Sequence, residues 1–266
     1  MAAFGLLSAL VQLISALWAM KEGFPYPAWL MTTIGLASFG YGAFRARPKY
    51  RLSHSFSHPD LTIEVVVGDI FEQDAHLVVG ASDTFDTDIT DDLIINSKSV
   101  LGQCLLKAFE GDRRRLDGEL RSALRRVAPV AEEASNAKRG KLKRYEMGTV
   151  AVLGIPARRI FLVAYSRMGN DLIARSTVND LWQALGQVWS VMRDHGRRES
   201  IAIPLIGTEF ARVSSMNKEN VAKMILLSFM AHSRAEPICK RLLLMVEPRD
   251  AEAVNMYELE AYLKSL

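Results

Sequence analysis

Two segments of the sequence, each placed where a predicted strand ends, carry residues suited to holding a phosphorylated ligand. The first is Gly68-Asp69-Ile70, which follows the β-branched run 61–67, and the second is Gly207-Thr208-Glu209-Phe210-Ala211, which follows the apolar run 200–205. Ligands of open α/β sheets bind beyond the carboxyl ends of strands, and a turn of small residues lets backbone N–H groups point at phosphate oxygens. The two segments therefore predict a phosphate-binding site, with ordinary strand-end turns as the alternative interpretation.

The histidines and cysteines form no catalytic or metal-binding pattern. Cys104 and Cys239 lie far apart in the sequence, without CxxC or Cys/His spacing, so the sequence predicts neither a zinc site nor a disulfide. His76 lies close to Asp74, but no cysteine or second histidine is nearby. No Ser/His/Asp group stands out either, and we expect no metal and no cofactor.

Basic residues gather in two places, the run Lys138–Arg144 and the cluster Arg113–Arg115. Either could contact anionic lipid head groups, at about 1 kcal/mol per residue near a negative surface, or form a solvated loop. The whole chain has 33 basic and 30 acidic residues and a formal charge of +3. Its overall charge therefore does not require nucleic acid as a partner.

The first 44 residues predict a membrane anchor of two helices. Residues 2–20 carry no charge, and a helix of that length spans roughly 28 Å, close to the hydrocarbon thickness of about 30 Å. Residues 28–44 form a second uncharged run, and a cleaved signal peptide is the alternative for the first. Basic residues crowd the segment 45–51, which predicts a two-span protein of the cell inner membrane with a cytoplasmic domain. Small residues four apart in the spans would allow helix contacts, within one hairpin or between copies.

A change of pattern divides the rest of the chain into a linker and a domain. Residues 45–60 are polar with two prolines and predict a linker, whereas 61–266 alternates β-branched runs with helical periodicity, which is typical of an α/β domain. We expect strands at 61–67, 77–81, 149–153, 160–165, 200–205 and 241–246. We expect helices at 100–109, 116–126, 177–195, 218–231 and 250–264.

The segments 68–70 and 207–211, in this order and about 140 residues apart, resemble those of a macro domain, the module that binds ADP-ribose. The resemblance covers roughly residues 61–246 and implies a three-layer α/β/α sandwich with a mixed six-stranded sheet. It also implies that Asp69 accepts a hydrogen bond from the adenine amino group, helped by the backbone of Ile70, and that 207–211 wraps the diphosphate. A carboxylate only accepts hydrogen bonds, so it suits an exocyclic amine.

The loop after the second predicted strand departs from the macro-domain pattern. Where catalytically active macro domains carry asparagines and three glycines, this sequence reads Ala81-Ser82-Asp83-Thr84-Phe85-Asp86-Thr87-Asp88-Ile89. We expect Ala81, Ser82, Asp83 and Thr84 to bind the ligand, with the acidic loop reading a substituent on the distal ribose; a solvated acidic loop is the alternative. Because the hydrolase signature is missing, we do not expect an enzyme.

Two N-terminal spans joined to a divergent macro domain are similar to the membrane-anchored effectors of the bacterial Thoeris anti-phage system. The resemblance implies that a TIR-domain partner makes a signal from NAD, an ADP-ribose conjugated to histidine, and that the effector binds it. It further implies that the effector self-associates and disrupts the lipid bilayer, so that the infected cell is sacrificed. A membrane-tethered hydrolase of ADP-ribose adducts and a scaffold that binds no ligand are the alternatives.

Overall fold

The computed structural model describes residues 12, 32–33, 35–41, 50–207 and 216–266. The chain divides into two compact units, Met1–Lys49 and Tyr50–Leu266. In the first unit, the described residues 35–41 are helical. Most of the predicted anchor over 1–44 lies outside the described residues, and among those that are described no helix is both long and apolar enough to cross a bilayer.

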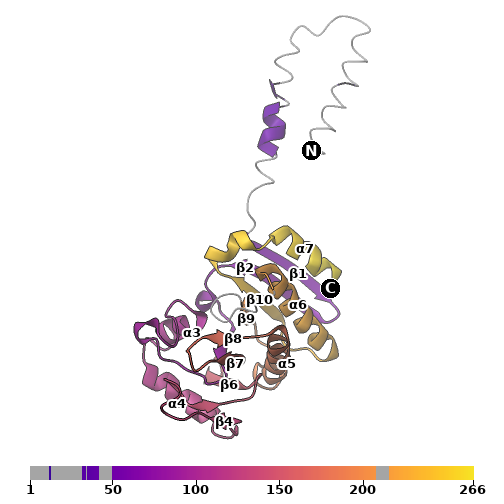
Figure 1. The fold of residues 1–266 in the computed structure, drawn as a ribbon. Coiled ribbons are helices and arrows are strands. Elements are labelled where there is room, and N and C mark those ends of the chain that lie inside the picture. Colours follow the sequence, from indigo (N-terminus) through magenta and orange to yellow (C-terminus); the bar gives the residue numbers. More distant parts are fainter. Residues whose placement is uncertain (1–11, 13–31, 34, 42–49, 208–215) are drawn as a thin grey trace, which may run out of the picture. The chain divides into compact units, whose positions relative to one another are not determined.

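A mixed sheet organises the second unit (Figure 1). Its strands follow the order β1-β2-β10-β9-β3-β7-β6, and the short β8 pairs with β7 outside this path. The five central strands, from β2 to β7, run parallel, whereas β1 and β6 are antiparallel edges. The strands are β1 (Arg51–Ser57), β2 (Asp60–Val67), β3 (His76–Ser82), β6 (Val150–Ile155), β7 (Arg158–Met168), β8 (Ala174–Arg175), β9 (Ile201–Pro204) and β10 (Arg241–Val246). A separate two-stranded ribbon joins β4 (Ala131–Glu132) to β5 (Lys143–Arg144).

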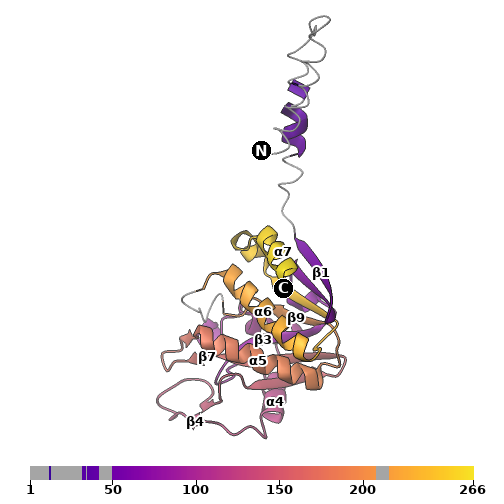
Figure 2. The same cartoon turned by 90° about the vertical axis from the view of Figure 1, so that its right-hand side faces the viewer.

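Helices cover both faces of this sheet and make three layers (Figure 2). One face carries α5 (Val178–His195), α6 (Lys218–Ala235) and α7 (Met256–Ser265), and the other carries α3 (Val100–Gln103), its π-helical continuation η3 (Cys104–Ala108) and α4 (Arg113–Ala123). Three short 3₁₀ helices lie in connections of the domain: η1 (Ile70–Glu72) after β2, η2 (Thr90–Asp92) between β3 and α3, and η4 (Pro248–Ala253) after β10. Each face has its own apolar core, so the parallel strands between them are buried on both sides.

Local capping explains where the longest helices begin. The Thr177 hydroxyl accepts from the backbone N–H of Asp180, and the Asp180 carboxylate accepts from the backbone N–H of Thr177, which is a capping box for α5. Asn217 caps α6 through the N–H of Asn220. Along α5, side chains such as Trp189 lie fully buried against the sheet. The three-layer sandwich predicted from the sequence is therefore present.

The sheet is larger than the six strands expected, because residues 51–57 of the predicted linker form β1. This strand pairs with β2 in antiparallel register, with Arg51 opposite Val66 and Ser57 opposite Asp60. Of its seven residues only Leu52 is fully buried, so its sequence is as polar as that of a loop. The linker interpretation is thus wrong for 51–57, and the domain begins at Tyr50 rather than at residue 61.

Candidate functional site

A cavity of about 720 Å³ opens where the parallel strands end. Each of the five strands contributes to its lining through Gly68 after β2, Met245 of β10, Pro204 of β9, Ser82 of β3 and Ser166 of β7. Neighbouring strands lie about 4.8 Å apart, so the four spacings from β2 to β7 give the cavity a length of roughly 19 Å. This is the edge at which open parallel sheets bind their ligands.

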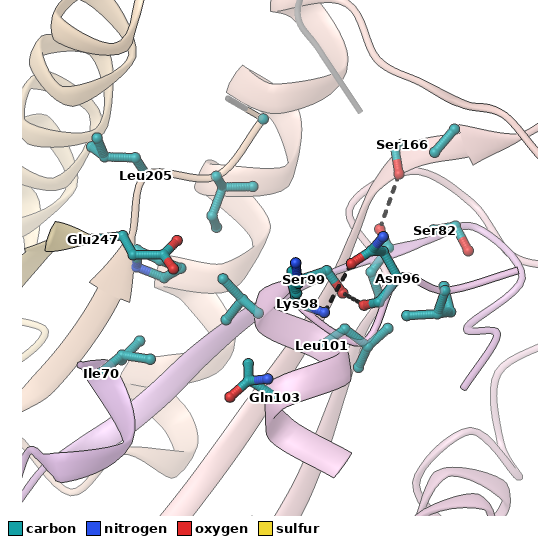
Figure 3. A pocket seen from close by; sticks show the side chains of 18 of the residues that line it. Ile70, Ser82, Asn96, Lys98, Ser99, Leu101, Gln103, Ser166, Leu205 and Glu247 are labelled. Carbon is teal, nitrogen blue, oxygen red and sulfur yellow. Dashed lines mark hydrogen bonds between the residues drawn. The ribbon is translucent and has the colours of Figure 1, made fainter. Parts of the chain in front are cut away.

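The cavity has two distinct ends (Figure 3). Ile70, Leu205 and Glu247 lie on one side of the view, whereas Ser82, Ser166 and Asn96 lie on the other. We call the first the Asp69 end, because Asp69 lies two residues after the end of β2 and also lines the cavity. The second we call the Ser82 end.

Asp69 is held by two partners in the structure. Its Oδ1 accepts from the backbone N–H of Phe71 at 2.9 Å, which caps η1, and its Oδ2 pairs with the Lys107 ammonium. Lys107 lies on the π-helix η3 and is also 5.7 Å from the centroid of the Phe71 ring. Each carboxylate oxygen can accept more than one hydrogen bond, so Asp69 retains capacity for a ligand donor. Ile70, the next predicted site residue, is buried and lines the same end.

The Ser82 end is shaped by an irregularity in the sheet. Ala81 pairs with Ala164, but Ser82 pairs with Ser166, so Tyr165 is an extra residue on β7. Bulges of this kind re-aim side chains and are common beside functional sites. Ala81, Ser82, Tyr165 and Ser166 all line the cavity, which brings the predicted residues Ala81 and Ser82 into the site.

Asp83 and Thr84 do not line the cavity, contrary to the expectation for the acidic loop. Asp83 is 6% exposed; its Oδ2 pairs with Arg144 at 2.8 Å and its Oδ1 accepts from the N–H of Met168. Thr84 is 1% exposed and donates to Asp86. Buried polar groups require such partners, so both residues have structural roles within the domain and neither belongs to a solvated loop.

Basic residues of the run 138–144 form ion pairs with the acidic residues of that loop. Lys138 and Asp86 form an ion pair of 2.7 Å that is almost fully buried, and Lys141 pairs with Asp117 at 2.6 Å. Burial lowers the pKa of Lys141, and the carboxylate of Asp117 opposes that shift. With Arg144 bound to Asp83, these three cations are paired with carboxylates of the domain, so neither lipid contact nor a solvated loop describes them, whereas Arg139 and Lys143 of the same run are exposed.

Gly207 lies at the start of the predicted phosphate turn and lines the cavity. Its φ is +87°, in the left-handed region of the backbone that residues other than glycine adopt only at a cost in free energy. A residue with positive φ is typical of the backbone nests whose N–H groups bind phosphate. The other predicted members of the turn, Thr208, Glu209, Phe210 and Ala211, lie outside the described residues.

The sequence did not single out the segment that forms one wall of the cavity. Asn96, Lys98, Ser99 and Gln103 line it, just before and within α3. Ser99 caps α3 through the N–H of Gly102, and Gln103 donates to Ser97 O at 2.9 Å, which fixes the wall. The available signal was a run of polar residues directly before the predicted helix 100–109.

His76 is buried as a neutral structural residue. Its Nε2 lies 3.1 Å from Gly196 O, and its Nδ1 accepts from the N–H of Arg159 at 3.1 Å. Burial lowers the pKa of the His76 imidazole below its ordinary value. This agrees with the hydrogen bonds, because a neutral imidazole has one nitrogen that donates, here Nε2, and one that accepts, here Nδ1. Within the described residues, no group of three or more His, Cys, Asp or Glu side chains is arranged to hold a metal ion.

Comparison with known proteins places this site in a family. A family model described as "Thoeris protein ThsA, Macro domain" matches residues 63–247. The Thoeris protein ThsA of Bacillus amyloliquefaciens (strain Y2) is 24% identical over 211 residues, which are 76% of this chain and 68% of the relative. Among solved structures, a mutant of the Oceanobacillus iheyensis macrodomain is 18% identical with a TM-score of 0.48, covering 83% of this chain and 97% of its own. The Trypanosoma brucei macrodomain in complex with ADP-ribose is 12% identical with a TM-score of 0.47, covering 76% and 68%. Because the family model spans nearly all of the sheet and the cavity, the chain belongs to the macro-domain family of Thoeris protein ThsA.

Proposed function

We propose that this protein binds an ADP-ribose-type nucleotide and serves as the sensing component of a Thoeris defence system. The observation that carries the proposal is the elongated cavity across five strand ends, roughly 19 Å long with a carboxylate at one end. An extended nucleoside diphosphate sugar suits such a site: the adenine amino group at Asp69, the diphosphate at the Gly207 turn, and the terminal ribose at the Ser82 end. The volume of about 720 Å³ is in the range of small-molecule sites.

We propose that the site binds its nucleotide without cleaving it. Hydrolysis needs a base that can activate water beside the scissile bond. The acidic residues that follow β3 are poorly suited to this, because Asp83 is held by Arg144 and Asp86 by Lys138. The asparagines and glycines typical of catalytically active macro domains are also missing from 81–89.

The wider role that we propose follows the Thoeris resemblance. A TIR-domain partner would make the nucleotide, an ADP-ribose conjugated to histidine, and residues 1–44 would anchor the protein in the inner membrane with its nucleotide domain in the cytoplasm. Ligand binding would then drive self-association and membrane disruption. By linkage, the ligand can do this only if it binds the assembled form more tightly than the resting form.

Calorimetry of the full-length chain with ADP-ribose and with its histidine conjugate tests the proposal. We expect saturable binding of both, with tighter binding of the conjugate, and unchanged nucleotide when the mixtures are analysed by chromatography after incubation. Absence of binding would refute the nucleotide site. Release of free ADP-ribose from the conjugate would instead identify a hydrolase.

A further inference from the structure

A line of buried hydrogen bonds connects the cavity wall to an ion pair behind it. Ser82 Oγ lies 3.1 Å from Thr84 Oγ1, Thr84 Oγ1 donates to Asp86 Oδ2 at 2.6 Å, and Lys138 Nζ donates to the same oxygen at 2.7 Å. Ser82 and Lys138 are 4% exposed, and Thr84 and Asp86 are 1% exposed. Of these four residues only Ser82 lines the cavity.

The positions of the hydroxyl hydrogens follow from the charge at the end of this line. Asp86 accepts on both oxygens, from Lys138 and also from the N–H of Lys141 at 2.6 Å, so the carboxylate is ionised and has no hydrogen to give. Thr84 must therefore use its single hydroxyl hydrogen on Asp86. Ser82 can bond Thr84 only by donating its own hydrogen, which leaves the Ser82 oxygen with lone pairs alone.

We propose that Ser82 is a specificity-determining residue that accepts hydrogen bonds from the ligand but donates none, and that Thr84, Asp86 and Lys138 are positioning residues that impose this polarity. The Ser82 end then selects a neutral donor, such as a hydroxyl of a terminal ribose. It disfavours an anionic acceptor such as a terminal phosphate, because lone pairs would face lone pairs. The inference rests on the proposed function and states which chemical group that site reads.

The backbone at Gly140 holds the arrangement in place. Gly140 has a φ of +85°, and a Cβ on it would lie 2.3 Å from Asp86 Oδ1, so only glycine lets the loop with Lys138 close over the carboxylate. The neighbouring hydroxyl of Ser166 shows the contrast, since its hydrogen bond to Ala81 O is 3.4 Å long and involves no charge. Figure 3 shows Ser166 and Ser82 at the same end of the cavity. The charge of Asp86 therefore fixes the orientation of the Ser82 hydroxyl, whereas the Ser166 hydroxyl can rotate.

Thr84→Val is the variant that tests the polarity, because it keeps the shape of the side chain and frees the Ser82 hydrogen. The chain offers a matched control in Thr87→Val: Thr87 is 2% exposed and donates at 2.7 Å to Asp117, which is also paired with a lysine, but it does not line the cavity. Thr84→Ser retains the hydroxyl and should restore the wild-type behaviour.

The measurement is calorimetry of the full-length chain with three probes: ADP-ribose, ADP, and ADP-ribose phosphorylated on C1 of the terminal ribose. In the wild type we expect ADP-ribose to bind about tenfold more tightly than the phosphorylated analogue. In Thr84→Val the freed Ser82 hydroxyl can still accept from a ribose hydroxyl and can now also donate. ADP-ribose and ADP should therefore bind within about threefold of wild type, whereas the phosphorylated analogue should bind about five- to tenfold more tightly than it does to the wild type, the gain usual for one hydrogen bond, which largely removes the discrimination. Thr84→Ser and Thr87→Val should keep all three affinities near wild type.

Several results would overturn the inference. One is an equal loss for all three probes in Thr84→Val, since that marks a structural effect; another is discrimination against the phosphate as strong in Thr84→Val as in the wild type. If Thr84→Val does not fold, Ser82→Ala makes the same test, because it removes the oxygen and keeps the Thr84–Asp86 bond; unchanged ADP-ribose affinity in that variant also refutes the idea. A wild-type chain that binds neither ADP nor ADP-ribose would contradict the proposed function itself, whereas binding of both without discrimination contradicts only the inference.

Discussion

Asp69→Asn separates ligand binding from folding at the Asp69 end of the cavity. Asparagine keeps an oxygen for the N–H of Phe71, and it caps helical turns about as well as aspartate. It loses the negative charge and replaces the second oxygen, which pairs with Lys107, by an amide group that donates. An adenine amino group would therefore meet a donor where the wild type offers an acceptor.

The contacts of Asp69 give the size of both effects. The side chains of Lys107 and Asp69 are 45% and 28% exposed, and exposed ion pairs contribute about 0 to 1 kcal/mol. A lost hydrogen bond to a charged group costs about 1.5 to 3 kcal/mol, which is about 10- to 150-fold in Kd. We therefore expect a large loss of ADP-ribose affinity with a change of less than about 1 kcal/mol in the free energy of unfolding.

Calorimetry with ADP-ribose and urea denaturation of the same preparations measure the two quantities. Asp112→Asn is the matched control, because Asp112 caps α4 through the N–H of Arg115 at 3.0 Å and does not line the cavity. It should leave affinity unchanged. Wild-type affinity in Asp69→Asn would remove Asp69 from the site, and a loss of stability as large as the loss of affinity would show that its role is structural.

Three further substitutions address the phosphate turn, the edge of the sheet and the anchor. Gly207→Val should abolish nucleotide binding and, because Gly207 has a φ of +87°, also lower stability by about 1 to 3 kcal/mol; calorimetry and thermal melting check both, and normal binding would show an ordinary turn. Burial raises the pKa of Glu64, but hydrogen bonds and charges from Arg241 and Arg51 hold it below its ordinary value. The ionised Glu64 should therefore contribute its full stabilisation above the unfolded pKa of about 4.3, and this stabilisation should be lost as pH falls through the lower folded pKa. In urea denaturation at pH 3 to 6, Glu64→Gln should reduce the dependence of the free energy of unfolding on pH, and an unchanged dependence would contradict the role of Glu64. Replacing residues 1–44 by an unrelated two-span hairpin should preserve ligand affinity but abolish ligand-dependent dye leakage in cells with equal membrane levels; full leakage would refute assembly through the spans.

The central strands could be predicted because each is apolar enough to be buried on both faces. β10 reads Arg-Leu-Leu-Leu-Met-Val and was located to the residue, and every other predicted strand overlaps an observed one. β1 was missed because an edge strand needs to bury only one side, and its sequence alternates serine with larger residues. Its identity depends on β2, whose Glu64 binds Arg51 at 2.8 Å. That pairing is invisible in the local pattern.

The candidate site was predicted where backbone geometry determines it and not where distant charges do. Gly207 and Asp69 were identified because strand ends and turns have local signatures, and both line the cavity. Asp83 was misassigned because an acidic loop looks solvated or ligand-facing until its partner is known. That partner is Arg144, 61 residues further along the chain. Burial of an ion pair is a property of the folded chain, and the sequence within one loop does not encode it.

The two ends of the cavity are held by interactions of different strength, and this decides how each can act. The ion pair of Asp69 with Lys107 is partly exposed, so water and salt screen it and a ligand can displace it at little cost. The pair of Asp86 with Lys138 is nearly inaccessible, and breaking it would leave an uncompensated charge in the interior. The Asp69 end can therefore rearrange around the group that it binds, whereas the Ser82 end presents one fixed hydrogen-bonding pattern before any ligand arrives. Under the proposed function, a nucleotide must satisfy the Ser82 end as it stands, and the inferred polarity of Ser82 then places discrimination between related nucleotides on the terminal sugar and its substituent.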